Sequence, residues 1–356
     1  MSRKPPVPFR GRGALSQPDN RYEPQKRESI EEDPTGQHLE TRFFPDSAKT
    51  IINRNNSPDV GFSQSINPYR GCEHGCIYCF ARPTHAYLGL SPGLDFETRI
   101  FFKKDAAMLL QRELSKKGYR CEPVALGINT DAYQPIEEEL LVTRSILEVL
   151  DRFSHPVTIV TKSALIERDI DLLQKMARRG LAHVFLSIPT LNETLSRSLE
   201  PRAAAPWRRL EVIRTLSAAA IPTGVLVAPV IPALTDHEPE GILKASREAG
   251  AISAGYVLLR LPLELRELFE EWLDHHAPLA SKAVLSRMRE FHGGALYESG
   301  FGTRMRGSGP LAELLEQRFS VMARKLGFRE MPKLETGLFH IPGSTSENRL
   351  FPDFPA

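Results

Sequence analysis

Six short apolar segments alternate with longer segments of helical periodicity between residues 61 and 263, and this alternation restricts the fold more than any other feature of the sequence. The expected strands cover about residues 63–69, 123–128, 157–160, 182–188, 225–227 and 256–260. The expected helices between them cover about residues 137–153, 166–179, 206–220 and 238–248. Apolar strands that alternate with helices are typical of a parallel sheet covered by helices. Six such units fit an α/β fold that is either a doubly wound sheet or a partial barrel.

The segments that flank this region have a different character. Residues 1–60 contain eight prolines, mixed charges and little periodicity, so we expect an extended or disordered lead-in. Within it, Arg10-Gly-Arg12-Gly could contact nucleic acid, but a solvated flexible tail fits the balanced local charge better. Residues 264–356 are expected to form a helical extension and tail, with helices at about 264–275, 278–292 and 310–326.

Charge and hydropathy exclude several classes of protein. The 46 Lys and Arg residues nearly balance 44 Asp and Glu, which argues against a basic coat for nucleic acid or a polybasic membrane protein. No apolar segment follows the basic start, and Pro and Gly interrupt the uncharged stretch 215–235, so we expect neither a secretory signal nor a membrane span. We therefore expect a cytoplasmic protein with reduced cysteines. Residues 281–333 carry ten Lys and Arg against five Glu, which fits an anionic substrate or an ordinary solvated helix face equally well.

Three of the four cysteines lie within eight residues. Cys72, Cys76 and Cys79 have the spacing C-x3-C-x2-C, and Gly71 and Gly75 permit the backbone turns that bring three thiolates around one centre. Three such sulfurs can hold three irons of a cubane cluster and leave the fourth iron open to another ligand. The alternative is a structural zinc site completed by His74 or His85. The absence of a second CxxC pair favours iron and sulfur over zinc.

The segment Cys72-Glu-His-Gly-Cys-Ile-Tyr-Cys79 resembles the CxxxCxΦC signature of radical S-adenosylmethionine (SAM) enzymes. Further segments resemble the spore photoproduct lyase-like branch of that superfamily, often labelled DNA repair photolyase-type. These segments are Asn67-Pro-Tyr-Arg-Gly-Cys72, Thr130-Asp-Ala-Tyr-Gln-Pro-Ile-Glu137, Thr161-Lys-Ser163, Leu199-Glu-Pro-Arg202 and Ala228-Pro-Val-Ile-Pro232. The resemblance covers about residues 60–330 and implies a partial (βα)6 TIM-like barrel.

The resemblance also implies a set of cofactor contacts. Cys72, Cys76 and Cys79 would ligate a 4Fe-4S cluster, and the amino and carboxylate groups of SAM would chelate its fourth iron. Tyr78 would lie beside the adenine, Thr130 and Asp131 beside the ribose, and Lys162 and Ser187 beside the carboxylate end. These residues follow or end expected strands, where parallel α/β folds build their sites. Arg202 and Arg304–Arg306 are further candidates for substrate or SAM contacts, although surface ion pairs explain each of them more simply.

One departure from the branch concerns its hydrogen donor. Spore photoproduct lyase is expected to carry a hydrogen-donating cysteine just before the ribose-binding acid, and here Leu126-Gly-Ile-Asn-Thr-Asp131 contains none. The spare thiol, Cys121, precedes the strand and is expected at the opposite face of the barrel, as a structural residue.

The sequence therefore predicts an enzyme that reductively cleaves SAM at a 4Fe-4S cluster, producing a 5'-deoxyadenosyl radical that abstracts hydrogen from an unknown substrate. Such an enzyme needs a reducing partner such as flavodoxin or ferredoxin. One alternative is repair of a nucleic-acid lesion, with nucleic acid as substrate. Another is a zinc-bound nucleic-acid-binding module without catalysis.

Overall fold

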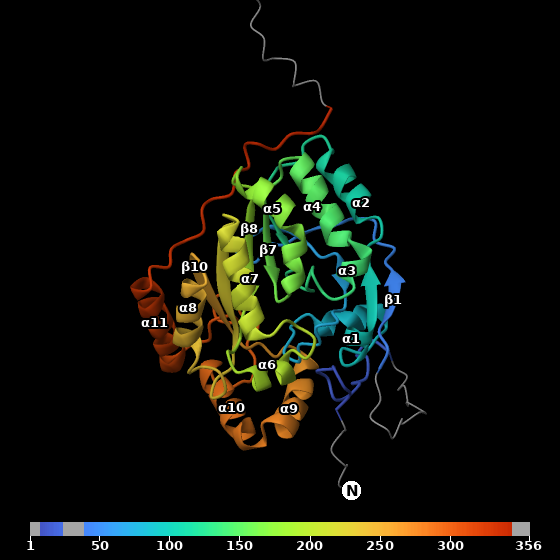
Figure 1. The fold of residues 1–356 in the computed structure, drawn as a ribbon. Helices are drawn as coiled ribbons and strands as arrows, with labels where there is room; N and C mark the ends of the chain where they lie inside the picture. Colours follow the sequence, from blue (N-terminus) through green and yellow to red (C-terminus); the bar gives the residue numbers. More distant parts are fainter. Residues whose placement is uncertain (1–7, 24–38, 344–356) are drawn as a thin grey trace, which may run out of the picture.

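The computed structural model describes residues 8–23 and 39–343, and its centre is a seven-stranded sheet curved into an open barrel (Figure 1). The strands of this sheet are β2 (Ile52–Arg54), β3 (Gln64–Ile66), β6 (Val124–Leu126), β7 (Val157–Thr161), β8 (Ala182–Ser187), β9 (Thr223–Val230) and β10 (Ser253–Leu258). Their order is β10-β9-β8-β7-β6-β3-β2, parallel throughout except for the antiparallel β2. The six parallel strands confirm the predicted partial barrel, with β10 and β2 as its free edges.

Helices cover the outer face of this sheet and one of its ends. The outer helices are α4 (Val142–Arg152), α5 (Ile170–Ala177), α7 (Pro206–Ala218), α8 (Pro239–Glu248) and α11 (Pro310–Lys325). The end of the barrel that carries α6 (Glu193–Leu199) is covered by α9 (Leu265–His276) and α10 (Pro278–Phe291), as Figure 1 shows. The remaining elements are β1 (Arg42–Pro45), β4 (Tyr69–Arg70), η1 (Arg82–Leu88), α1 (Asp95–Thr98), β5 (Arg99–Phe102), α2 (Ala106–Leu114), α3 (Glu137–Leu140) and η2 (Ala164–Asp169). No helix in the described ranges is long and apolar enough to cross a membrane.

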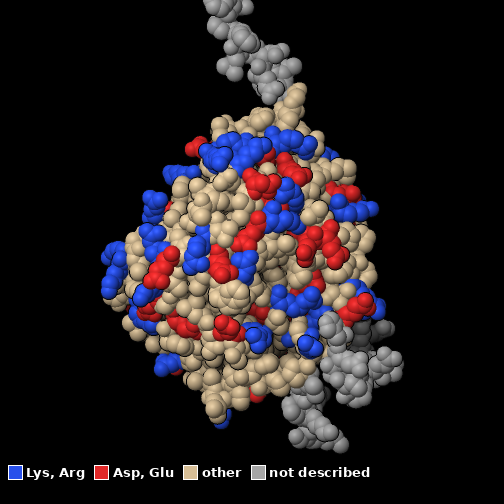
Figure 2. Space-filling view, in the orientation of Figure 1, with Lys and Arg blue, Asp and Glu red and all other residues tan. Residues whose placement is uncertain are grey.

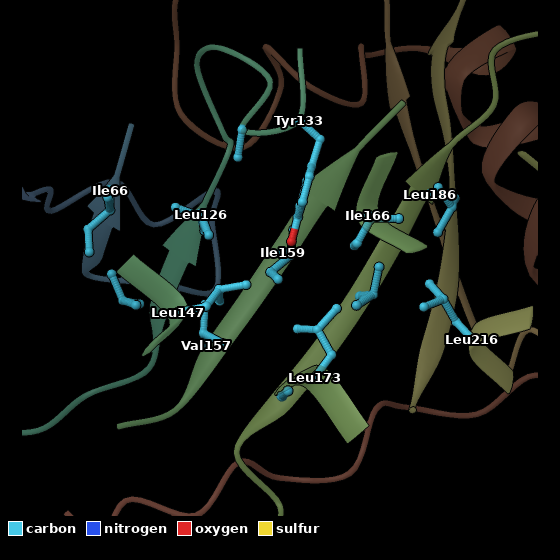
Figure 3. Packing of buried hydrophobic residues seen from close by; sticks show 14 of the residues in the cluster. Ile66, Leu126, Tyr133, Leu147, Val157, Ile159, Ile166, Leu173, Leu186 and Leu216 are labelled. Atoms are coloured by element: carbon cyan, nitrogen blue, oxygen red, sulfur yellow. The ribbon is translucent and has the colours of Figure 1, made fainter. Parts of the chain in front are cut away.

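The core lies between the sheet and the outer helices. In β7, Val157 and Ile159 are fully buried and pack with Leu147 of α4 and Leu173 of α5 (Figure 3). Because side chains alternate along a strand, the intervening Thr158 faces the inside of the barrel. Each strand thus divides its side chains between an apolar core outside and a lumen inside.

Two predicted helices are interrupted. The helix expected over 137–153 is divided into α3 and α4 at Leu141, whose φ of 53° lies in the left-handed region. The helix expected over 166–179 begins as a 3-10 turn, η2, before α5. In the first case the break turns α3 away from α4, so that Glu137 reaches the interior and is fully buried. Apolar periodicity does not reveal a break of this kind, because the apolar positions continue across it.

Residues 8–23 and 39–60 of the expected lead-in are extended but not disordered, so that part of the prediction is corrected. They contain β1 and β2, each paired in a sheet, and Ala14 and Leu15 are buried. Arg12 is also buried, and its guanidinium donates hydrogen bonds to the carbonyl of Glu97 and the hydroxyl of Thr41. The expected solvated Arg-Gly tail is therefore part of the folded body. Residues 1–7, 24–38 and 344–356 lie outside the described residues.

The described C-terminal tail, residues 327–343, crosses the amino ends of the strands. Three of its amides donate hydrogen bonds to carbonyls that stand just before strands: Arg329 to Ile252, Glu335 to Gly180 and His340 to Phe153. Figure 1 shows this segment at the end of the barrel opposite α9 and α10. The tail therefore covers the base of the barrel and leaves its carboxyl end to the site described below.

Acidification is expected to destabilise the fold through a histidine near this base. His155 is fully buried; its Nδ1 donates to the carbonyl of Pro156 and its Nε2 accepts from Tyr119. Burial lowers the pKa of His155 to about 4, whereas histidine in an unfolded chain titrates near 6.5. The unfolded state then binds more protons between these pH values, so stability falls as pH drops from about 6.5 towards 4, by about 2 kcal/mol at pH 5.

Urea unfolding of His155→Phe at pH 7.5 and pH 5 measures this contribution. The variant should lose less stability than the parent between the two pH values, while a His237→Phe control at an exposed position should lose as much as the parent. An identical loss in the parent and His155→Phe would contradict the assignment.

Candidate cofactor site

A cavity of about 270 Å³ lies at the carboxyl end of the barrel, and seven of the eight predicted site residues line it. These are Cys72, Cys76, Tyr78, Cys79, Asp131, Lys162 and Ser187. They come from the loop after β4 and from the ends of β6, β7 and β8. Thr130 is the exception, because its hydroxyl donates a hydrogen bond of 2.8 Å to the carbonyl of Tyr69 and does not line the cavity. Thr130 therefore anchors the chain beside the site.

The cysteine loop, residues 71–80, folds back on itself through two glycines. Gly71 and Gly75 have φ of 80° and 68°, the left-handed region that glycine adopts without strain. The amide of Cys79 donates to the carbonyl of Cys76 at 3.2 Å, which turns the second half of the loop. Burial raises the pKa of both Cys76 and Cys79, and neighbouring cysteines raise it further. The three cysteines thus line one cavity, where metal coordination would deprotonate their thiols.

Within residues 8–23 and 39–343, no three His, Cys, Asp or Glu side chains stand close enough to one another to hold a single metal ion. Cysteines on a cubane cluster bind separate irons. The residues that fit such a cluster are three cysteines on one cavity wall, from a loop whose backbone is already turned.

A buried ion pair fixes the back of the cysteine loop. Arg82 donates to the carbonyls of Cys76 at 2.9 Å and Gly75 at 3.1 Å, and it pairs with Glu97 at 2.5 Å. Both charged side chains are fully buried. The other contacts of Glu97 come from residues 9–16, which we term the N-terminal strap: the amides of Gly13 and Ala14 donate to its carboxylate at 3.0 and 2.9 Å.

Contact between the strap and the loop is close. A Cβ at Gly13 would lie 1.9 Å from the carbonyl oxygen of Gly75, so only glycine permits this approach. The strap has no periodic pattern that would predict its burial, since that burial depends on backbone contacts. Gly13, the second glycine of the Arg10-Gly-Arg12-Gly segment that was expected to be a flexible tail, is a packing residue.

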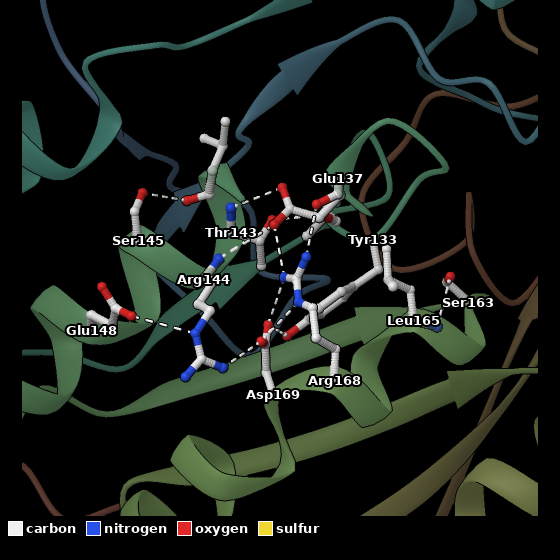
Figure 4. Close-up of polar contacts among 12 residues, drawn as sticks. Tyr133, Glu137, Thr143, Arg144, Ser145, Glu148, Ser163, Leu165, Arg168 and Asp169 are labelled. Carbon is white, nitrogen blue, oxygen red and sulfur yellow. Dashed lines mark hydrogen bonds and ion pairs between the residues drawn. The ribbon is translucent and has the colours of Figure 1, made fainter. Parts of the chain in front are cut away.

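The segment 130–137 holds the front of the loop. Gln134 accepts from the amide of Glu73 at 2.9 Å, and the carboxylate of Glu73 accepts from the amide of Ile136 at 2.9 Å. Farther along, buried Glu137 accepts from Arg168 and from the amide of Thr143 (Figure 4). Most of this segment is therefore a brace between the cysteine loop and the helices around α4.

The carboxylate of Asp131 accepts its hydrogen bonds from groups of the protein itself. One oxygen accepts from Thr161 at 2.7 Å and from the amide of Tyr133 at 2.9 Å; the other accepts from the amide of Lys162 at 2.8 Å and lies 3.4 Å from His74 Nδ1. Burial opposes ionisation, but His74 and these donors outweigh it and lower the pKa of Asp131 to about 2. The carboxylate is thus charged, and its oxygens are occupied by protein groups. It therefore positions the backbone of Lys162 and the ring of His74.

The ammonium group of Lys162 forms no ion pair within the described ranges. Its Nζ lies 5.9 Å from the centre of the Tyr78 ring. Burial disfavours the charged form, but Cys76 and Glu200 nearby outweigh this and raise the pKa of Lys162. A permanently charged cation that faces a cavity beside the cysteines can receive a carboxylate from a ligand.

Behind Lys162, a fully buried chain of polar contacts fixes Tyr78 and the end of β8. The Tyr78 hydroxyl donates to Glu200, which pairs with Arg209. Arg209 in turn donates to the carbonyl of Ser187 at 2.7 Å. The Ser187 hydroxyl donates to the carbonyl of Ala228 at 3.0 Å and retains lone pairs that can accept from a ligand.

The cavity residues that were not predicted from the sequence include Asn129, Phe80 and Arg260. Arg260 follows β10 as Lys162 follows β7, so the strand-end rule could have identified it. Its guanidinium lies 5.2 Å from the centre of the Phe80 ring, and its buried Nε has no hydrogen-bond partner in the described parts of the chain. The other arginines considered are engaged elsewhere: Arg202 pairs with Glu73 at 3.1 Å and Arg304 with Asp59.

Comparison with known proteins agrees with this geometry. Residues 66–245 match the Radical SAM superfamily. An uncharacterized protein of Mycobacterium tuberculosis, Rv2578c, is 36% identical over 247 residues, which cover 68% of this chain and 72% of that protein. An uncharacterized protein of Methanocaldococcus jannaschii, MJ0683, is 30% identical over 191 residues, covering 54% and 68%.

Among solved structures, spore photoproduct lyase complexed with dinucleoside spore photoproduct superposes with a TM-score of 0.56 over 80% of each chain at 15% identity. A lyase mutant with bound AdoMet and dinucleoside spore photoproduct gives a TM-score of 0.55, also over 80% of each chain at 15% identity. These likenesses establish a shared fold. Together, the matched residues and the relatives show that the chain belongs to the radical SAM superfamily.

Proposed function

We propose that this protein binds a 4Fe-4S cluster through Cys72, Cys76 and Cys79 and reductively cleaves SAM to start a radical reaction on a further substrate. The observation that carries the proposal is one cavity that joins three cysteines, the end of β8 and the ammonium of Lys162, which has no ion-pair partner among the described residues. The cavity stands at the carboxyl ends of parallel strands, where such folds place their chemistry. A reduced cluster, when bound, supplies the electron that splits SAM into methionine and a 5'-deoxyadenosyl radical.

The residues around the cavity divide the binding of SAM between them. Lys162 would pair with the SAM carboxylate, and Ser187 would hydrogen-bond to the same end of the ligand. Tyr78, held by Glu200, would present its backbone and ring to the adenine. Thr130 and Asp131 were expected at the ribose; their hydrogen bonds support instead an indirect role, in which Asp131 fixes the backbone of Lys162. The apolar walls would exclude water from the reactive carbon.

An external one-electron donor such as flavodoxin or ferredoxin completes the proposal. Nucleic-acid repair has weaker support. Basic and acidic side chains are intermixed over the face shown in Figure 2, and two arginines of the basic C-terminal region are paired, Arg318 with Glu240 and Arg287 with Glu290. The segment 126–131 also lacks the cysteine expected of the lyase reaction. We therefore do not extend the lyase substrate to this chain.

The decisive measurement is formation of 5'-deoxyadenosine. Protein reconstituted with iron and sulfide without oxygen, then mixed with dithionite and SAM, should yield 5'-deoxyadenosine and hold about four irons per chain. Cys76→Ala should lose the product, because the cluster loses one of its three protein ligands. Cys121→Ala, a half-buried cysteine outside the cavity, is the matched control and should retain it.

Two results would contradict the proposal. One is the absence of 5'-deoxyadenosine from protein that holds its four irons. The other is undiminished product from Cys76→Ala. One zinc and no iron in the purified protein would favour the zinc-bound module.

A further inference from the structure

A second, larger cavity of about 560 Å³ occupies the lumen of the barrel. It adjoins the cofactor cavity across an apolar wall of seven residues that line both cavities: Val60, Phe62, Ile128, Val160, Leu226, Val257 and Met305. At its far end Met331 of the C-terminal tail joins the lining. We term this cavity the inner chamber. A molecule held in it would stand beside the cofactor cavity, inside the barrel.

Two neutral polar side chains stand next to each other in the chamber. Thr158 of β7 and His183 of β8 are paired in register across the two parallel strands, and both line the chamber. His183 is 5% exposed and Thr158 is half-buried, and neither side chain forms a hydrogen bond with another of the described residues. The imidazole and the hydroxyl therefore have free hydrogen-bonding groups that a ligand in the chamber, or water that a ligand displaces, can satisfy.

Charge is largely absent from the chamber. Burial lowers the pKa of His183 to about 4, so its ring is neutral at neutral pH. The carboxylate of Asp59 is neutralised by Arg304 and accepts from the amide of Gly302 at 2.6 Å. Arg306 is exposed at the rim, where its guanidinium lies 4.1 Å from the centre of the Tyr256 ring. A charged group in the lumen would lose its hydration without a partner, which is costly.

We propose that the inner chamber binds the substrate, an uncharged and mostly apolar small molecule whose polar head group hydrogen-bonds to Thr158 and His183. The proposal rests on the proposed function, because it places the substrate next to the SAM-binding cavity. Neutral imidazole offers one donor and one acceptor and the hydroxyl offers both, so an amide, hydroxyl or ring nitrogen satisfies the pair. The apolar body would then extend along Val160 and Leu226, whose side chains border both cavities.

A matched series of naphthalene probes tests the chemistry of the chamber without turnover. Naphthalene-2-carboxamide, naphthalene and naphthalene-2-carboxylate share one apolar body and differ in the head group. Fluorescence titration should show one site per chain, with the carboxamide tightest and the carboxylate at least tenfold weaker than the carboxamide. His183→Phe and Thr158→Val should each weaken carboxamide binding by about fivefold, the equivalent of one hydrogen bond, and leave naphthalene binding unchanged.

His237→Phe, at an exposed position, is the matched control and should leave all three affinities unchanged. Near-ultraviolet circular dichroism shows whether each variant is folded. The proposal is overturned if no probe saturates at one site, if the variants bind the carboxamide as the parent does, or if the carboxylate binds tightest and Arg306→Gln abolishes that preference. Formation of 5'-deoxyadenosine is measured separately, so probe failure with product formation rejects the chamber alone, whereas loss of product rejects the proposed function.

Discussion

Replacing Glu97 with glutamine should lower the melting temperature by roughly 5–10 °C and reduce the iron retained after reconstitution. The substitution leaves Arg82 as a buried cation without its counterion, and breaking a buried pair in this way typically costs about 3–5 kcal/mol. Glu97 also accepts from Gly13 and Ala14, so the N-terminal strap and the cysteine loop both lose an anchor. Differential scanning fluorimetry and iron analysis of gel-filtered protein measure the two effects.

The control for this change is Glu290→Gln. Glu290 pairs with Arg287 at 2.9 Å on the surface, with its side chain 48% exposed, and such pairs contribute little. Its melting temperature should therefore stay within about 1–2 °C of the parent. If Glu97→Gln proved as mild as Glu290→Gln, the proposed role of the strap in holding the loop would be wrong.

Replacing Lys162 with methionine should weaken SAM binding by about 100-fold while leaving the iron content unchanged. Methionine keeps the length and apolar stem of lysine but removes the charge that we assign to the SAM carboxylate. Titration calorimetry with the oxidised, anaerobic protein measures the affinity without turnover. Iron analysis distinguishes lost SAM binding from a lost cluster.

Lys175→Met provides the matched control, because Lys175 is 65% exposed and pairs with Asp151 on the surface. It should bind SAM as the parent does. If Lys162→Met bound SAM as tightly as the parent, Lys162 would not be the residue that contacts the carboxylate. Arg260, another cation of the cavity, would then be tested first. Lys162→Arg should recover part of the affinity, since it restores the charge with a different shape.

The sequence was most informative where residues follow strands. The positions of Asp131, Lys162 and Ser187 could be predicted because parallel strands present their carboxyl ends on one face. The same rule would have identified Arg260, which follows β10. The cysteine spacing predicted that the thiolates of Cys72, Cys76 and Cys79 gather around one centre, and the structure places all three residues on one cavity.

The directions of side chains and the packing of extended backbone could not be predicted from the sequence. Thr130 stands at a strand end as predicted, yet its hydroxyl turns to the carbonyl of Tyr69. The strap has neither helical nor strand periodicity, and its burial follows from Gly13 meeting Gly75 and from amides that bind Glu97. The break at Leu141 leaves the apolar pattern intact, so it gives no periodic signal.

The bracing of the cysteine loop on both sides has a consequence for assembly. Arg82 and Glu97 hold one side of the loop and Gln134 and Glu73 the other, through contacts made entirely by protein groups. Little backbone entropy therefore remains to be lost when metal enters, in contrast to small zinc domains whose folding free energy comes from the ion. Oxygen damage to a bound cluster should accordingly leave a folded, refillable protein.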